Sequence, residues 1–570
     1  MRRRRSATPQ AASLEGRDIA VENAGGELIG DLDGPLAVVD RAGTVALAGV
    51  RWRIAWAVGA EDRWHIAGRE AAVRSRLVDD MPVAETAMRV PGGDVVQRVS
   101  AVRDRSGRGL LLAFENQSPG PVSLALAVIQ NDTGRRGANV GRPRRRRHPA
   151  LVEVRGSRLM VDGQVALDLG RPPGGAVAVA DGGVWTAVAA GPDSGDCRSR
   201  SRSGRAAAAA VVPLVPRAPM RATVPLCGGP DQGAARGEAA SGWLTVVARA
   251  AAVSLPDETA MRAWRRGIAG SILVAGSNGV LSRSDCSKPR ARRRNRHNGT
   301  VVPAVRMART AVVLDRVGLP DEADRARGPL LEAAEASRLS GEEAGAALLA
   351  LSSRRLRSGR ASELAHLAGP LAHQAGGSLQ PHTLEQVAAA LDTEAPGAAR
   401  DAREMLRDLE VRSPRASCRN EGDAVVESAV ERAVEGAGHE AARPVFTGSA
   451  NRGALLNLAG ILRRSVAFGG DGLDGVEALV DCLVAEAPDH LTIAPLLPDE
   501  WIGAPVDAHG LLTRHGTLSF SVRWHGTRPA LLWELQPARA GNPATRIRCG
   551  LDDSWQTGTP AGEALLEPVD

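Results

Sequence analysis

The chain has 570 residues, of which 43% are hydrophobic and 24% charged, and its formal net charge is +7. This length predicts three or four domains with a large buried core, and the composition is typical of a soluble protein. No run of about 18 apolar residues occurs, which argues against a transmembrane helix. No apolar segment follows the basic start MRRRRSATPQ, so we expect no secretory signal.

Cysteine spacing and short motifs limit the chemistry that the chain can carry. The six cysteines are widely separated, and no pair has the two-residue spacing of a zinc or redox site. We therefore expect a reducing, cytoplasmic location without disulfides or a structural metal. The sequence also lacks P-loop, dinucleotide-binding, His-Glu-x-x-His and Gly-x-Ser-x-Gly motifs, and we expect no cofactor.

Positive charge is concentrated in four short arginine-rich islands, at residues 2–5, 142–147, 198–205 and 288–296. The rest of the chain is acidic overall, so the islands do not belong to one broad basic face. Such runs can contact phosphate groups, but solvated, disordered loops or a shifted reading frame are the favoured explanation. Because no aromatic residue interleaves with the arginines to stack on bases, nucleic-acid binding is the least favoured function.

Residues 18–255 predict an antiparallel β-sandwich, preceded by a disordered basic segment at 1–17. Short apolar runs alternate with Gly, Pro and Asp turns throughout this region. Pro91-Gly92-Gly93-Asp94 predicts a hairpin turn between two strands. Further strands are expected at 36–40, 44–50, 51–58, 110–116, 122–130, 151–154 and 184–190.

Residues 256–489 predict a region of consecutive helices. Asp257 is a suitable N-cap for the first of them, and Gly318-Leu319-Pro320 is a stop signal after which Asp321 would cap the next helix. Short connections favour antiparallel αα-hairpins. About ten helices are expected, the later ones at 302–317, 321–338, 341–357, 362–374, 383–391, 396–409, 423–434, 451–466 and 476–485.

The last segment, residues 490–570, predicts a small β-region. Residues 517–524 alternate so that Leu518, Phe520 and Val522 share one face, and a turn at 525–529 leads into a returning strand at 530–535. The sequence therefore predicts a multidomain α+β protein with four segments: 1–17, 18–255, 256–489 and 490–570.

This order of segments resembles that of the six-hairpin glycosidases, of the glucoamylase-like and glycogen-debranching-like type. Three stretches carry the resemblance: DMPVAETAMRVPGGDVVQR at 80–98, GEEAGAALLAL at 341–351, and LTIAPLLPDEW at 491–501 followed by Gly503. The resemblance implies a central (α/α)6 toroid, complete or incomplete. A complete toroid has twelve helices where this sequence predicts about ten, and Gly341 stands where such enzymes have a tryptophan.

The resemblance also implies a function, the metal-independent hydrolysis of α-glucosides or related glycans. Glu342 would then be the catalytic acid, with Glu343 as second choice, although acidic residues are also ordinary at a helix start. Trp501 and Trp524 would bind the sugar. The second carboxyl group is left open among Glu427, Glu431, Glu435 and Asp471.

A second function stays open, that of a non-catalytic carbohydrate-binding or scaffold protein with the same architecture. It is favoured by the lack of any aromatic residue between Trp264 and Phe446, because aromatic rings usually line sugar subsites. A carbohydrate is the expected ligand under both functions, and the oligomeric state is undetermined. Isolated histidines are expected at the surface or in turns, at positions 366, 373, 509, 515 and 525.

Overall fold

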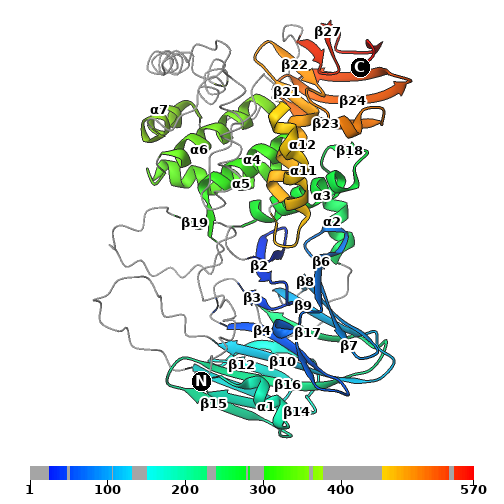
Figure 1. Cartoon of the computed structure of the whole chain (residues 1–570). Helices are drawn as coiled ribbons and strands as arrows, with labels where there is room; N and C mark the ends of the chain where they lie inside the picture. The colour runs from blue at the N-terminus through cyan, green and yellow to red at the C-terminus, as the bar shows by residue number, and fades with distance from the viewer. Residues whose placement is uncertain are drawn as a thin grey trace, which may run out of the picture.

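Figure 1 shows the protein as a computed structural model, with two large sheets, a middle layer of helices and two C-terminal sheets. A further sheet of two parallel strands, β19 (Val280–Ser282) and β20 (Val301–Pro303), precedes α4. The structure describes residues 25–47, 50, 52–104, 107–130, 150–180, 182–226, 239–277, 280–282, 301–339, 341–358, 364–375, 390, 452–470, 472–537 and 545–569. The architecture is mixed α+β with several units, as the sequence predicts. The basic segments 2–5, 142–147 and 288–296 and the predicted helices at 396–409 and 423–434 lie outside the described residues.

The first large sheet has eight strands, and four of them coincide with the strands expected at 36–40, 44–50, 51–58 and 122–130. Its strands β1 to β4, β10, β16 and β14 are hydrogen-bonded in this order, and β5 pairs with β4. The strand bounds are Glu27–Asp31, Gly34–Val39, Val45–Leu47, Trp52–Gly59, Val122–Gln130, Ala206–Leu214 and Gly175–Ala180, with β5 at Trp64–Ile66.

The second large sheet has nine strands, in the order β15-β11-β12-β13-β17-β9-β8-β7-β6. The predicted hairpin is confirmed, because β7 ends at Val90, β8 begins at Gly93, and Gly92 adopts a positive φ of 84° that glycine allows without strain. The strand bounds are Cys197–Ser201, Ala150–Arg155, Arg158–Val161, Gln164–Asp168, Met220–Pro225, Gly107–Asn116, Gly93–Asp104, Ala84–Val90 and Val73–Leu77.

The two large sheets share one hydrophobic core. Alternate residues of each strand point inward, as in β10, where Val122, Leu124, Leu126 and Val128 belong to this core. The rings of Trp56 on β4 and Phe114 on β9 lie 5.6 Å apart at the centre of this core. The tilted arrangement of the two rings is one that aromatic pairs favour.

Two local predictions in these regions are wrong. The residues expected as a strand at 184–190 form helix α1 (Val184–Ala190), because Val184 and Val188 share a helical face that packs on alanines of the eight-stranded sheet. Asp321 does not cap a helix. Helix α5 begins one residue earlier, at Pro320, since proline lacks the N–H that the first helical turn leaves unpaired.

The first half of the basic stretch at 198–205 forms a strand rather than a loop. Residues 198–201 belong to β15, which forms the edge of the nine-stranded sheet and pairs with β11. Arg198 and Arg200 are exposed and Ser201 is buried, so this stretch alternates as a strand does. Exposed charges on an edge strand oppose its pairing with another chain.

The helices lie between the large sheets and the C-terminal sheets (Figure 1). Asp257 caps α3 as predicted, because its Oδ1 accepts a hydrogen bond from the Thr259 amide at 2.7 Å. The described helices are α2 (Ala239–Val247), α3 (Glu258–Ala275), α4 (Ala304–Arg316), α5 (Pro320–Glu335), α6 (Glu342–Ser353), the π-helical η3 (Arg354–Ser358), α7 (Leu364–Ala375), α11 (Arg452–Val466) and α12 (Gly472–Leu483).

Glycines bring two helices from distant parts of the sequence into close contact. A Cβ atom on Gly267 of α3 would lie 2.4 Å from the carbonyl oxygen of Gly472 at the start of α12. Helices α4, α5, α6 and α7 pack on one another in sequence order, and α3 packs on α11 and α12. The closed toroid stays a prediction, because residues 376–389 and 391–451 lie outside the described part of the chain.

Two small sheets close the other end of the molecule. One has the order β18-β23-β24-β25-β28, with bounds Ala252–Ser254, Val506–Thr513, Gly516–His525, Arg528–Pro537 and Ala561–Leu565. The other has the order β21-β22-β26-β27, with bounds Val484–Glu486, His490–Ile493, Arg546–Cys549 and Asp552–Thr557. The predicted hairpin is confirmed, since Leu518, Phe520 and Val522 are buried and His525 pairs with Arg528 across the turn.

Ion pairs join the large sheets to the helices. Glu27 of β1 pairs with Arg266 of α3, and its carboxylate also accepts a hydrogen bond from the Gly469 amide at 2.7 Å. Asp80 accepts a hydrogen bond from Arg262 at 3.1 Å. Strand β18, within the segment predicted as the sandwich, pairs instead with β23 of the C-terminal sheet. The division into four segments itself stays a prediction.

Candidate functional site

The two predicted catalytic carboxylates lie together in the first turn of α6. Ala344, Ala347, Leu348 and Leu351 are buried along one face of this helix at helical spacing, while Glu342 is exposed and Glu343 is half-buried. Acidic side chains in a first turn are stabilised by the positive end of the helix dipole. Both positions therefore satisfy the local rules of a helix start and remain near solvent.

Gly341 sets the entry into this helix. Its φ of 53° with ψ of −127° lies in a region that glycine adopts readily and other residues do not. The Gly341 amide donates a hydrogen bond of 2.9 Å to the carbonyl oxygen of Gln374, near the end of α7. The start of α6, with Glu342 and Glu343, is thus attached to the end of α7.

The opposite end of α6 lies in a buried polar network. Asp315 of α4 is fully buried, and its Oδ2 accepts hydrogen bonds from Arg327 and, at 2.8 Å, from Ser353 Oγ. Arg327, which is only 1% exposed, also donates to the Ala350 carbonyl at 2.9 Å. Burial raises the pKa of the Asp315 carboxyl against the opposing effect of Arg327.

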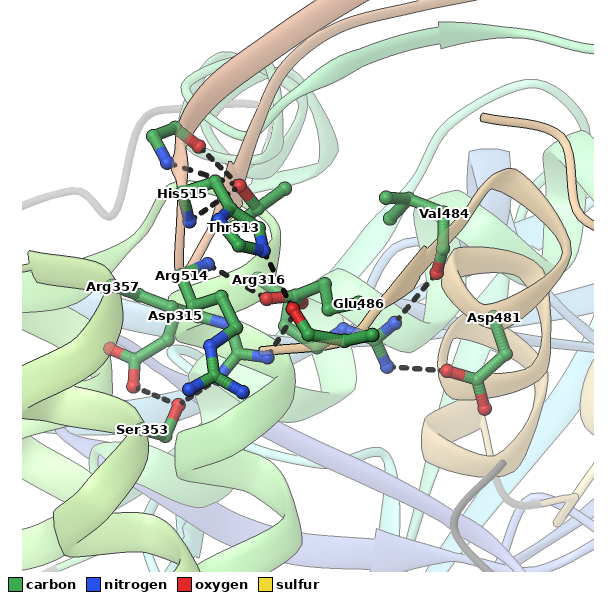
Figure 2. A network of polar contacts seen from close by, with 12 residues as sticks. Asp315, Arg316, Ser353, Arg357, Asp481, Val484, Glu486, Thr513, Arg514 and His515 are labelled. Carbon is green, nitrogen blue, oxygen red and sulfur yellow. Dashed lines mark hydrogen bonds and ion pairs between the residues drawn. The ribbon is translucent and has the colours of Figure 1, made fainter. Parts of the chain in front are cut away.

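Glu486 connects this end of α6 to the C-terminal sheets (Figure 2). One carboxylate oxygen accepts from Arg357 Nη2 and the other from the Arg514 amide, each at 2.7 Å. Burial raises the pKa of Glu486, but the charges of Arg357 and Arg316 and the bond from Arg514 outweigh burial and hold it below its ordinary value. Glu486 is therefore an ionised carboxylate whose two oxygens are both bound.

His515 completes the network at the turn between β23 and β24 (Figure 2). Its Nε2 lies 2.8 Å from the Ala487 carbonyl oxygen, and since a carbonyl only accepts, Nε2 carries the proton. Its Nδ1 lies 3.3 Å from Thr545 Oγ1. Burial lowers the pKa of His515, so the ring is neutral near pH 7.

The network has the properties of a structural joint rather than of a reaction site. Each carboxylate in it is paired with an arginine, as Asp481 is with Arg316 at 2.6 Å, and the groups are enclosed by α4, α6, α12 and β21. A buried charge without a partner is costly, which explains the pairing of every member. The network holds the C-terminal end of α6 at Ser353, about 16 Å along the helix axis from Glu342.

No local pattern in the sequence predicts this network. Its members come from residues 315 to 515, and their spacing has neither helical nor strand periodicity. Only the folded chain brings them together. One weak signal exists in Arg316, because an arginine that closely follows the apolar run Ala311–Leu314 of a helix needs a buried acceptor.

The predicted sugar-binding tryptophans lie in the C-terminal region and are neighbours. Trp501, in the short helix η5 (Asp499–Trp501), is 3% exposed and packs in the core, and its carbonyl accepts from the Ala504 amide at 3.1 Å. Trp524 is half-buried and donates from Nε1 to the Ala504 carbonyl at 2.9 Å. A sugar-binding role stays a proposal for both tryptophans.

The remaining predicted groups are distributed rather than clustered. Glu427, Glu431, Glu435 and Asp471 lie outside the described residues. His366 and His373 are exposed on α7, while His515 and His525 lie at opposite ends of β24. Within the described ranges, no group of three or more His, Cys, Asp or Glu side chains could hold a metal ion.

Two further observations concern thiols and membranes. Burial raises the pKa of the Cys482 and Cys549 thiols to about 12, so neither is a thiolate at neutral pH. Among the helices that the structure describes, none is both long enough and apolar enough to cross a bilayer.

Comparison with known proteins gives similarity at the level of solved structures alone. No protein-family model and no curated protein sequence matches the chain. A bacterial glucoamylase complexed with acarbose is 11% identical with a TM-score of 0.44, over 70% of this chain and 69% of that chain. A putative kojibiose phosphorylase from human microbiome is 5% identical with a TM-score of 0.37, over 92% of this chain and 91% of that chain. Neither similarity reaches the level that identifies a common fold.

Proposed function

We propose that the chain is a glycoside hydrolase-like protein that acts on α-glucosides or related glycans by metal-independent acid–base hydrolysis. The observation that carries the proposal is the position of Glu342 and Glu343. They lie near solvent at the start of a helix whose other end is fixed by a buried network of ion pairs. A fixed backbone with accessible carboxyl groups is what a positioned general acid requires.

Glu342 is proposed as the acid that protonates the leaving glycosidic oxygen, with Glu343 as second choice. Adjacent residues on a helix diverge by about 100°, so the two side chains do not face one substrate atom together. The base therefore comes from another element, and in an inverting enzyme it lies about 6.5–9.5 Å from the acid to leave room for water. Glu427, Glu431, Glu435 and Asp471 remain the candidates for this role.

The proposal is tested by following hydrolysis of a panel of α- and β-glucosides through the anomeric protons by NMR. The wild type is compared with Glu342→Gln and Glu343→Gln. Glu335→Gln is the matched control, because Glu335 is an exposed carboxylate at the end of the neighbouring helix α5. Circular dichroism establishes that each variant is folded.

We expect turnover of an α-glucoside that Glu342→Gln reduces by about 10²–10⁴-fold, the usual contribution of a general acid. Glu335→Gln keeps the wild-type rate. The first anomer formed shows whether the reaction inverts or retains configuration. Absence of turnover on every glucoside, in folded wild-type protein, contradicts the proposal.

One set of observations favours the alternative, a non-catalytic carbohydrate-binding or scaffold protein. No aromatic residue occurs between Trp264 and Phe446, Trp501 is buried, and Trp524 is hydrogen-bonded to the chain's own backbone. Saturable binding of a glucan in calorimetry, without any hydrolysis in the NMR assay, supports this alternative. Hydrolysis lost in Glu342→Gln supports the enzyme.

A further inference from the structure

A shallow cleft of about 270 Å³, wide open to solvent, lies on the outer face of the C-terminal five-stranded sheet. It lies where β18 meets β23 and β24, two parts of the chain about 250 residues apart in sequence. Ser254 of β18 is paired with Asp507 of β23, and Asp507 in turn with Ser521 of β24. This volume lies just below the usual range of small-molecule sites, about 300–1,000 Å³, so the cleft fits a single small ring rather than a larger ligand.

Asp507 organises the polar side of the cleft. Its Oδ1 accepts a hydrogen bond from Ser521 Oγ at 2.6 Å and lies 2.7 Å from Arg523 Nη1. No described contact uses Oδ2. Burial raises the pKa of Asp507, but the bonds from Arg523 and Ser521 and the charge of His509 outweigh burial, so the group is a carboxylate. The cleft thus presents the Asp507 carboxylate, fixed in position as an acceptor, beside the Arg523 guanidinium as a donor.

His509 adds to the cleft an imidazole ring that can form further hydrogen bonds. The pairing of β23 with β24 shifts register between His509 and Leu511, and Gly510 there has a positive φ of 85°. A β-bulge of this kind redirects the side chain beside it and is frequent next to binding sites. His509 is exposed and lines the cleft, and its imidazole can both donate and accept.

The charges of the cleft favour a neutral ligand. The Asp507 carboxylate repels an anion, and the guanidinium of Arg523 repels a metal cation. Donors and acceptors alternate over a short distance, and Ser254 and Ser521 contribute hydroxyl groups at the lining. Adjacent hydroxyl groups on one ring match this pattern, because each can donate to a carboxylate and accept from a guanidinium or imidazole.

We propose that this cleft binds a neutral polyhydroxylated ring of the sugar class, with Asp507 as acceptor and Arg523 and His509 as donors. The site lies on the C-terminal sheet and Glu342 lies at the start of α6, so binding in the cleft does not depend on catalysis. Since no tryptophan or phenylalanine lines the cleft, hydrogen bonds dominate recognition, and we expect a dissociation constant of about 1 mM.

The test follows the His509 ring by NMR in protein labelled with ¹³C at histidine, with the His509 signal assigned from its loss in His509→Gln. Maltose and, separately, inorganic phosphate are added to the full-length wild type. The same maltose titration is repeated with Asp507→Asn, with Glu342→Gln, and with Glu563→Gln. Glu563 is an exposed carboxylate on β28 of the same sheet, outside the cleft.

We expect maltose to shift the His509 signal saturably, and Asp507→Asn to weaken the dissociation constant at least about tenfold, because the acceptor loses its charge. Glu563→Gln and Glu342→Gln leave the dissociation constant unchanged. A signal that maltose does not move in folded protein overturns the proposal. A signal that responds to phosphate instead, or a maltose response that Asp507→Asn leaves intact, does so too. Failure of hydrolysis in the glucoside assay leaves this result unaffected, so the two proposals fail separately.

Discussion

The two ends of helix α6 hold the same kind of group in opposite surroundings. At the first turn, Glu342 and Glu343 lie near solvent. At the last turn, the nearby carboxylates Asp315 and Glu486 are buried and bound by arginines, serine and backbone amides. The helix backbone between them is continuous and its apolar face is buried throughout.

The contrast separates carboxylates that are enclosed in the fold from those that lie near solvent. An enclosed carboxylate that is paired with an arginine, as Asp315 and Glu486 are, has no room for substrate, whereas an accessible one on a fixed backbone does. Burying the ion pairs of Asp315 and Glu486 costs desolvation free energy. These pairs hold α6 in a defined position relative to the C-terminal sheets. Substitutions at the two ends of α6 should therefore differ in their effect on the free energy of unfolding.

Loss of Arg327 should have the largest effect on stability. Arg327→Ala leaves Asp315 buried without its main partner, and we expect about 3–5 kcal/mol of lost unfolding free energy. Arg325→Ala, two residues away on α5 with a side chain 44% exposed, should cost about 1 kcal/mol or less. Urea unfolding followed by circular dichroism measures both. Equal effects of the two substitutions would mean that the enclosed network contributes no special stability.

Removal of the Glu486 charge should cost about 1.5–3 kcal/mol at neutral pH, the value of hydrogen bonds to a charged group. Because its pKa in the folded state lies below the ordinary 4.5, the ionised group stabilises the fold above that value. The stability difference between wild type and Glu486→Gln should therefore shrink as the pH falls through the folded-state pKa. Unfolding curves between pH 7 and pH 3 measure this difference, and a difference that grows on acidification contradicts the assignment.

Substitution of Gly341 should affect the open end of α6. Its φ and ψ are strained for any residue with a Cβ, so Gly341→Ala should lower stability by about 1–3 kcal/mol. The matched control is Gly270→Ala on α3, where a Cβ would meet nothing within 4 Å and the change should be neutral or slightly stabilising. Thermal unfolding of the two variants compares them directly, and a neutral Gly341→Ala would show that the helix entry is not constrained.

The smallest effect is expected for Glu342 itself. Glu342→Gln removes one favourable charge at the helix N-terminus, worth about 0.3–1 kcal/mol. Urea unfolding at low and high salt measures the loss, which salt should reduce. A loss as large as that of Arg327→Ala would mean that Glu342 is part of the structural framework.

Much of the fold follows from local patterns in the sequence. The alternation of Leu518, Phe520 and Val522, the turn at Gly92 and the cap at Asp257 each rest on neighbouring residues, and the structure confirms all three. The segment 184–190 was misleading because its valines suit a strand as well as a helix. Packing against the eight-stranded sheet favours the helix over the strand at this segment. The residues of that sheet are distant in sequence, so the local pattern could not reveal this contact.

The candidate site is predictable only in part, for the same reason. The helix start at Glu342 and Glu343 is a local feature, and the structure places it where the pattern predicts. The network around Asp315 and Glu486 and the cleft at Asp507 join residues that are far apart in sequence. Their partners are chosen by the tertiary fold, and no spacing rule applies to them.

If Glu342 is the general acid, its loss should matter most for substrates whose leaving group needs a proton. Wild type and Glu342→Gln are compared by rate on maltose, whose leaving oxygen needs a proton, and on α-glucosyl fluoride, whose fluoride leaves with little help. We predict that Glu342→Gln slows maltose hydrolysis by about 10²–10⁴-fold while most of the activity on the fluoride remains. Equal loss on both substrates, or wild-type rates on maltose, would contradict the assignment of Glu342 as the acid.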